Sequence, residues 1–329
     1  MTRHHVVAGA LVLAAACQVV EIRSNPPSHA DLRVTIAARL DSLPARTSFY
    51  AKNLATGEEV TIRADVPMNT ASVIKLPVMV LAYRDADAGR LALDARHTIL
   101  PEEQRRGSGL LQTFAPGLQP TLRDIITQMI ITSDNTATDI MIAAVGQDRV
   151  NRLLDSLGYR QTHLRTTTGS LFRWVWEMAD SANATMTDRQ VFERGFPSDP
   201  GSDERIFRLA EDSTRWLGRT TAREIARLLE QLERGELAAR ASTDEMRDIL
   251  RTQFYSSRLP QRLQFVVPIG HKTGDIPPVL GNDVGIIYGQ NGPIVIAVFT
   301  NENRGDFFAI EATIGNVAKD VFDAWGRRR

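Results

Sequence analysis

The sequence predicts a mixed α/β fold of the α+β kind, with an antiparallel sheet flanked by helices and built from both chain ends. Two short segments with strand character occur near the N-terminus, and strand-like segments return in the final quarter. The chain between them carries apolar residues at helical spacing. Early strands, many helices and late strands together predict one shared sheet with an inserted all-helical lobe.

The first predicted elements are a helix and two strands. Asp31 is a candidate N-cap for a helix whose apolar face carries Leu32, Ile36, Ala37 and Leu40. Residues 48–52 and 59–63 are predicted as short strands on either side of a turn at 55–57. Another helix is expected to begin near Ala71.

Helical periodicity dominates the middle of the chain. Residues 122–132 place on one face Leu122, Ile125, Ile126, Met129 and Ile130. The same spacing predicts further helices over residues 138–144, 149–157, 221–233 and 243–252. Gly158 and Gly235 are suited to ending the helices that they follow.

The final quarter changes to the period of strands. Residues 266–273, 284–288 and 294–300 are predicted as strands. Gln290-Asn291-Gly292 predicts a hairpin turn between the last two. Residues 309–325 are predicted as an amphipathic C-terminal helix.

The N-terminus predicts export. Arg3 precedes an apolar run over residues 6–16, which is long enough for a signal-peptide core and too short for a membrane span. Cys17 follows small residues at the end of this run, and the arrangement resembles a bacterial lipoprotein cleavage site. We therefore predict a signal peptide over 1–17, either lipoprotein or simply secretory, and a linker over 18–31. The mature protein is expected to be periplasmic or secreted. Membrane attachment is expected only through a lipid anchor, if Cys17 carries one.

Composition excludes several classes of protein. Lysine and arginine together number 39, as do aspartate and glutamate, so no net charge attracts nucleic acid or an anionic membrane. The single cysteine excludes an intramolecular disulfide. The six histidines show no paired spacing of the kind that metal sites use, so neither a metal nor a cofactor is predicted. We expect a monomer that acts on a small molecule.

Three short motifs carry residues suited to acyl-transfer chemistry, and they occur in the order Ser72-Val73-Ile74-Lys75, Ser133-Asp134-Asn135 and Lys272-Thr273-Gly274. Ser72 and Lys75 are three residues apart at a predicted helix start, so their side chains are expected on one face. A serine hydroxyl attacks only when a neighbouring base takes its proton, and a lysine becomes such a base when burial or another cation lowers its pKa. The positive end of the helix favours a developing oxyanion.

The third motif is predicted at the end of a strand. Gly274 permits close approach of the backbone to a ligand, and Lys272 and Thr273 on a strand edge suit a substrate carboxylate. We expect His271 beside them to be a neutral strand residue.

This ordered set of motifs resembles the class A β-lactamases and penicillin-binding proteins. The resemblance spans residues 32–326 and implies a β-lactamase/transpeptidase-like fold. In that fold the sheet lobe corresponds to about 32–68 and 253–326, and the helical lobe to about 69–252. It implies a serine hydrolase that forms an acyl-enzyme with β-lactams or related amides, and β-lactam hydrolysis is the activity it favours.

The resemblance also implies roles for particular residues. Ser133 relays a proton to the leaving nitrogen, and Asn135 binds the amide of the substrate. The backbone N–H groups of Ser72 and Asp275 form the oxyanion hole. Family members often have a small residue where this chain has Asp275, so the side chain is expected to alter substrate access or the local field.

The chain departs from the class A pattern where the base for deacylation is expected. No glutamate stands at the usual distance after Arg165, and the segment 166–219 is longer than the family norm. Glu177 is a candidate base, or equally a surface residue of an inserted helix. The insertion is a candidate lid over the cleft.

Alternatives to β-lactam hydrolysis therefore stay open. Without a working base the protein would resemble a penicillin-binding D,D-peptidase or an esterase with slow deacylation. A different class is a non-catalytic envelope module that binds peptidoglycan. Covalent labelling by penicillin separates an enzyme from such a module.

Overall fold

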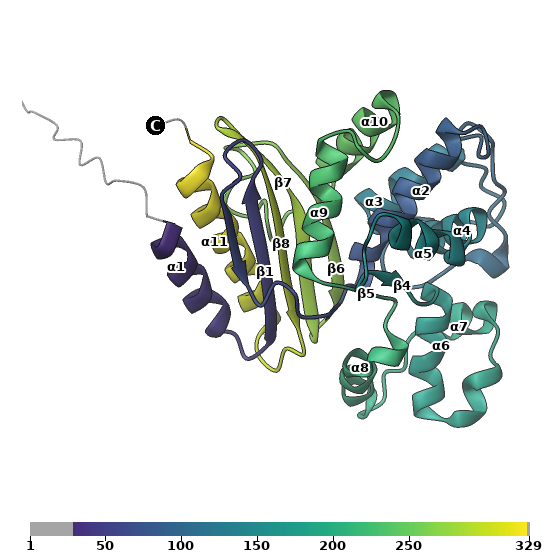
Figure 1. The fold of residues 1–329 in the computed structure, drawn as a ribbon. Coiled ribbons are helices and arrows are strands. Elements are labelled where there is room, and N and C mark those ends of the chain that lie inside the picture. The colour runs from purple at the N-terminus through teal and green to yellow at the C-terminus, as the bar shows by residue number, and fades with distance from the viewer. Residues whose placement is uncertain (1–28, 328–329) are drawn as a thin grey trace, which may run out of the picture.

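A five-stranded antiparallel sheet forms the centre of the protein in a computed structural model, which describes residues 29–327. The strands run in the order β2-β1-β8-β7-β6. Their bounds are β1 Arg46–Asn53, β2 Glu59–Ile62, β6 Ile269–Ile276, β7 Leu280–Gly289 and β8 Gly292–Asn301. Both ends of the chain contribute to this sheet, which confirms the predicted fold class (Figure 1).

The pairing of β8 joins the two ends of the chain. Along one edge β8 pairs with β1, so that Arg46 lies opposite Asn301. Along the other edge it pairs with β7 through a two-residue turn, and Gly289 lies opposite Gly292. Gly292 has a φ of 106°, which glycine adopts without strain. Since the centre of β8 is buried on both faces, its sequence is a continuous apolar run.

Helices cover both faces of the sheet (Figure 1). One face packs against α1 (His29–Asp41) and α11 (Phe307–Trp325), and its core includes Phe49, Ile296 and Ile314. The other face packs against α9 (Ala222–Glu233), whose N-cap Thr221 accepts a hydrogen bond from the backbone of Glu224. The prediction that Asp31 caps the first helix is wrong, because α1 already begins two residues earlier.

The second lobe lies between β2 and β6 in sequence and contains most of the helices. Its α-helices are α2 Lys75–Asp87, α3 Leu122–Ile131, α4 Asn135–Val145, α5 Gln147–Ser156, α6 Thr168–Ala179, α7 Asp188–Arg194, α8 Ser202–Glu211 and α10 Arg240–Arg251. Its 3₁₀ turns are η1 Ala71–Ile74, η2 Pro101–Glu103, η3 Leu111–Thr113, η4 Ser181–Thr185 and η5 Ser213–Arg215. The helices predicted from the periodicity of this region are all present, with ends that differ by a few residues.

The inserted lobe is not wholly helical, and in this detail the prediction needs correction. A small sheet in the order β3-β5-β4 is formed by β3 Met68–Asn69, β4 His163–Leu164 and β5 Gly218–Thr220. Strands of two or three residues are too short to leave a period in the sequence. This sheet fixes the chain just before Ser72, because β3 leads directly into η1.

The start of β6 also differs from its prediction. The strand was expected over 266–273, but it begins at Ile269 and continues to Ile276. Leu263 and Val267 precede it in turns and are buried in the core, so their apolar character reflects packing rather than a strand. As a result Lys272, Thr273 and Gly274 lie within the strand instead of at its end.

The predicted signal peptide, Cys17 and all but the last three residues of the predicted linker lie outside the described residues. Those last three residues, 29–31, belong to α1. Between residues 29 and 327 no helix combines the length and hydropathy that crossing a bilayer requires. Over the same range no cluster of three or more metal-ligating side chains occurs.

Candidate active site

Ser72 lies in the 3₁₀ turn η1, directly before α2, and its side chain faces a cavity. The preceding residue, Ala71, has a φ of 41°, a left-handed conformation that residues with a Cβ seldom adopt. Such a conformation persists only where the surrounding structure holds it, and it often marks a functional site.

Three buried asparagines hold the backbone that leads into η1. Asn282 donates from Nδ2 to the carbonyl of Asn69 at 2.9 Å, and Asn301 accepts from the backbone N–H of Asn69 at 2.7 Å. Asn69 in turn accepts the N–H of Ala71 at 3.0 Å. Because these buried amides are hydrogen-bonded to one another and to the backbone, they give Ser72 a rigid support. Asn301 was not singled out from the sequence, since a contact between residues so far apart leaves no local signal.

Lys75 is fully buried at the first turn of α2 and reaches the loop that holds the second motif. Its Nζ lies 2.7 Å from the carbonyl oxygen of Ser133, 3.2 Å from Ser133 Oγ and 3.0 Å from Asn135 Oδ1. Burial lowers the pKa of Lys75 well below its usual value, and the positive charge of Lys272 lowers this pKa further. In the described part of the chain no side-chain hydrogen bond joins Lys75 to Ser72, although both side chains were expected on one face; the backbone N–H of Lys75 donates to the carbonyl of Ser72.

The loop between α3 and α4 is built to present Ser133. Asp134 caps α4 by accepting the backbone N–H of Ala137 at 2.9 Å, and its other carboxylate oxygen accepts the N–H of Leu111 at 2.7 Å. Ser133 has a φ of 55° and is almost entirely buried. Its carbonyl and hydroxyl therefore point at the same lysine from a fixed position.

Lys272 supplies a second buried ammonium group from β6. Burial lowers its pKa to about 7, against the attraction of the carboxylates of Asp275 and Asp283. Its Nζ donates to the carbonyl of Thr273 at 2.8 Å. Within residues 29–327 the buried hydroxyl of Thr273 has no hydrogen-bond partner, which is a reason to expect a ligand atom there.

Gly274 is required by the close approach of β6 to η1. A Cβ atom at this position would lie 2.3 Å from the carbonyl oxygen of Thr70 and 3.2 Å from the backbone nitrogen of Ser72. Only a glycine lets the strand edge pass this close to the turn that carries the candidate nucleophile.

A cavity of about 640 Å³ opens beside Ser72, which is a size typical of small-molecule sites. Polar side chains surround the serine, and apolar side chains from the segment 166–219 form the opposite wall. The residues that line the cavity include Ser72, Ser108, Asn135, Thr168, Leu171, Phe172, Val175, Phe196, Ile206, Leu209, Leu217, Ser257, Arg258, Asp275 and Glu311.

Asp275 lines the cavity as half of an ion pair. Its carboxylate contacts Nη2 of the buried Arg258, which also donates from Nη1 to the carbonyl of Asn282 at 2.7 Å. Glu311 lies 3.5 Å from Arg258 Nε and accepts a hydrogen bond from Ser257. The charge of Asp275 is therefore balanced in the resting protein. Arg258 was not predicted as part of the site, because it lies in an irregular segment without a motif.

Glu177 belongs to an ion pair and does not line the cavity. Its carboxylate lies 3.2 Å from Arg215 Nη2, and it is absent from the residues that line the cavity. Of the two readings left open by the sequence, the structure favours the surface residue. The lining carboxylates are those of Asp275 and Glu311, and both contact Arg258.

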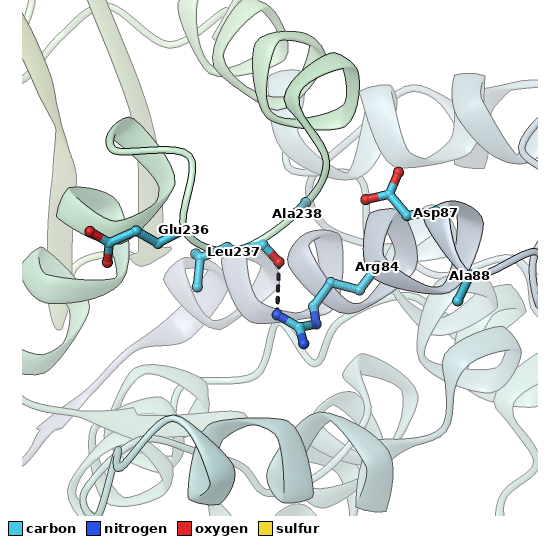
Figure 2. A pocket seen from close by; sticks show the side chains of 6 residues that line it. All are labelled: Arg84, Asp87, Ala88, Glu236, Leu237 and Ala238. Atoms are coloured by element: carbon cyan, nitrogen blue, oxygen red, sulfur yellow. Dashed lines mark hydrogen bonds between the residues drawn. The ribbon is translucent and has the colours of Figure 1, made fainter.

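A second cavity of about 380 Å³ lies at the other end of α2 (Figure 2). There Arg84 donates to the carbonyl of Leu237 at 2.8 Å. The rise of the helix places Asp87 about 18 Å from Lys75, so this cavity is separate from the site around Ser72. It is lined by Arg84, Asp87, Ala88, Glu236, Leu237 and Ala238.

The structure brings most of the predicted site residues together, whereas Lys272 and Thr273 are buried on β6 and are absent from the residues that line the cavity. Ser72, Asn135 and Asp275 line the same cavity, Lys75 joins Ser133 to Asn135, and Gly274 packs against the turn of Ser72. A buried base three residues after Ser72, beside the hydroxyl of Ser133 and with a second cation on β6, is suited to nucleophilic attack on a carbonyl carbon.

Comparison with known proteins finds matches over nearly all of the described chain. A family model described as the beta-lactamase enzyme family matches residues 31–325. A beta-lactamase of Streptomyces lavendulae is 23% identical over 309 residues, which cover 92% of this chain and 88% of that protein.

Solved structures share this fold. A beta-lactamase from Sphaerobacter thermophilus is 26% identical, with a TM-score of 0.70, over 88% of this chain and 95% of the other. A variant of PBP-A in an acyl-enzyme complex with penicillin G is 24% identical, with a TM-score of 0.69, over 90% of this chain and 96% of the other.

Proposed function

Because this chain belongs to the beta-lactamase enzyme family and is a serine beta-lactamase-like hydrolase, we propose that it opens β-lactam rings through an acyl-enzyme on Ser72. The observation that supports this most is the fully buried Lys75, held beside Ser133 and Asn135 one helical turn after the serine. A non-catalytic binding module has no use for a buried amine with a lowered pKa at this position.

The amine of Lys75 is held by three hydrogen bonds and acts as a base once it has lost a proton. A neutral amine has two N–H donors and one lone pair. In the structure Nζ donates to the carbonyl of Ser133, to Ser133 Oγ and to Oδ1 of Asn135. The neutral amine keeps two of these donations, and its lone pair is then free to take the hydroxyl proton of Ser72. Hydrogen bonds between a nucleophile and its base often form only when substrate binds. The lack of a side-chain hydrogen bond between Ser72 and Lys75 in the described chain therefore agrees with Lys75 as the base for Ser72.

In the acylation step, Ser72 Oγ attacks the lactam carbonyl carbon and its proton passes to the nitrogen of Lys75. The carbon–nitrogen bond then breaks, and the ring nitrogen takes a proton from the hydroxyl of Ser133, which Lys75 replenishes across 3.2 Å. The lysine is neutral again, and Ser72 carries an ester. Backbone N–H groups of Ser72 and Asp275 stabilise the oxyanion, while Lys272 and Thr273 bind the carboxylate.

Water then hydrolyses the ester and restores the Ser72 hydroxyl. This second step separates the proposed β-lactamase from a second candidate, a penicillin-binding enzyme with slow deacylation. One observation favours the second candidate. The carboxylates that line the cavity, within the described chain, are those of Asp275 and Glu311, and both are engaged by Arg258.

Turnover of a chromogenic cephalosporin, followed beside the mass of the protein, tests both candidates. Many product molecules per chain indicate a β-lactamase. A single burst of product with one persistent adduct per chain indicates the penicillin-binding candidate. An unmodified chain with no product contradicts the acyl-enzyme in either form.

We further propose that the protein is exported, because the apolar run 6–16 ends in small residues before Cys17. Cell fractionation of the full chain tests this proposal. The protein is expected outside the cytoplasm, and Cys17→Ala releases it from the membrane fraction only if the cysteine is lipidated. Accumulation of the uncleaved chain in the cytoplasm contradicts export.

A further inference from the structure

We propose that the apolar end of the cavity beside Ser72 is a binding pocket for a large apolar acyl group. The inference rests on the proposed acyl-enzyme and adds the class of substrate, namely amides and β-lactams whose acyl side chain is a long alkyl or aryl group. It follows from the wall that the segment 166–219 adds to the cavity.

One face of α6 forms much of this wall. Thr168, Leu171, Phe172 and Val175 follow the i, i+3, i+4, i+7 spacing that places side chains on one side of a helix, and all four line the cavity. Phe172 contacts Phe196 edge to face, with ring centroids 5.1 Å apart. The helix thus presents a continuous apolar surface to the cavity rather than a row of polar groups.

The opposite part of the wall comes from α8 and the residues after it. Ile206 and Leu209 on α8 line the cavity together with Leu217. Ile206 also packs in a small cluster with Ala71, the residue directly before the nucleophile. The apolar end of the cavity is therefore continuous with the turn that carries Ser72.

The base of α6 is anchored, so the wall has a fixed position. Asp139 accepts the backbone N–H groups of Thr168 and Gly169 at 2.8 and 2.9 Å, and Arg105 donates to the same carboxylate at 2.7 Å. Arg105 also contacts Asp188 on α7 at 2.7 Å. A pocket whose walls are held in this way loses little entropy when a ligand binds.

The position of Asn135 indicates which part of the substrate enters this pocket. Thr168 Oγ1 donates to the carbonyl of Asn135 at 3.3 Å, so α6 begins directly beside the residue proposed to bind the substrate amide. Lys272 and Asp275 lie on β6 instead, where the carboxylate is proposed to bind. The group that extends from the acyl carbon toward α6 is therefore the acyl side chain and not the leaving group.

A series of penicillins with one nucleus and straight acyl chains of increasing length tests the pocket. The second-order rate constant of acylation, measured from the growth of the adduct mass, is expected to rise about fourfold with each methylene that the wall buries. A rate constant that stays flat or falls with length overturns the inference. Adduct formation with the shortest member still supports the proposed acyl-enzyme, whereas no adduct with any member contradicts that function first.

Two variants on one helix locate the effect. Leu171→Asp puts a charge into the wall and is expected to abolish the dependence on chain length while leaving acylation by the shortest member. Met178→Asp makes the same kind of change at a position on α6 that does not line the cavity, and the dependence is expected to persist. Equal loss of the chain-length dependence in both variants overturns the assignment of the pocket to this wall. If Leu171→Asp does not fold, the penicillin series measured with the unchanged chain alone tests whether the pocket exists.

Discussion

Replacing Gly274 with alanine tests how closely β6 must approach the turn of Ser72. The added Cβ would lie 2.3 Å from the carbonyl oxygen of Thr70. A carbon and an oxygen settle no closer than roughly 3.3 Å, so the strand edge and the turn must separate by about 1 Å. The backbone N–H of Ser72 and the strand-borne groups of Lys272 and Thr273 would no longer share one geometry.

A displacement of about 1 Å in a reacting geometry lowers a rate by about 100-fold. We therefore expect Gly274→Ala to acylate about 100-fold more slowly, a loss of about 2.7 kcal/mol in transition-state stabilisation. The extra methyl group in a close-packed site is expected to lower the free energy of unfolding by about 1–3 kcal/mol. Stopped-flow acylation and thermal unfolding measure the two effects separately.

Gly270→Ala is the matched control, because it lies on the same strand. Its Cβ would meet the Leu250 side chain at 3.2 Å, which requires a shift of only a few tenths of an ångström. We expect its acylation rate to stay close to that of the unchanged chain. Equal acylation rates in Gly274→Ala and the unchanged chain, with the fold intact, would refute the argument that this contact sets the site.

Three further substitutions have defined outcomes. Lys272 loses its proton as the pH rises through about 7, so kcat/KM of the unchanged chain for carboxylate-bearing β-lactams is expected to decline above that pH. An arginine stays protonated, so this decline is expected to disappear in Lys272→Arg. An unchanged pH profile in the variant shows that Lys272 does not bind the carboxylate. Asp275→Ala leaves Arg258 without its nearest carboxylate and is expected to lower the free energy of unfolding by about 1–3 kcal/mol in a denaturant titration. Carboxylate-bearing β-lactams are expected to acylate faster, because the unpaired guanidinium of Arg258 adds positive charge to the cavity, and slower acylation contradicts this expectation. Glu177→Gln breaks only a half-exposed ion pair and is expected to leave the clearance of the acyl-enzyme unchanged in a mass time course; slower clearance would make it the deacylation base.

Local patterns predicted the elements of this fold well, and the family resemblance is confirmed. The turn at 290–292 and the helices in the middle of the chain depend on neighbours a few residues away, so their signals are contained in short segments. The start of β6 was misplaced because Val267 is apolar for packing in a turn. The small sheet of β3, β5 and β4 was missed because its strands are too short to show a period.

The candidate site was predictable in part. The three motifs contain the groups that the structure brings together around Lys75. Long-range contacts were not predictable, because nothing in the sequence near Arg258 indicates that it reaches Asp275, or near Asn301 that it supports Asn69. The face of α6 repeats at helical spacing, but the sequence alone does not say whether it packs in a core or lines a cavity.

The central claim is that Ser72 is the residue acylated by a β-lactam. The mass of the chain, followed from milliseconds to hours after mixing with penicillin and then localised by peptide mapping, tests this claim most directly. The unchanged chain and Ser108→Ala, which alters another serine of the cavity, are expected to gain one penicilloyl group on Ser72. Ser72→Ala is expected to gain none while unfolding at a similar temperature. An adduct that persists in Ser72→Ala, or that maps to a different residue, would contradict the account.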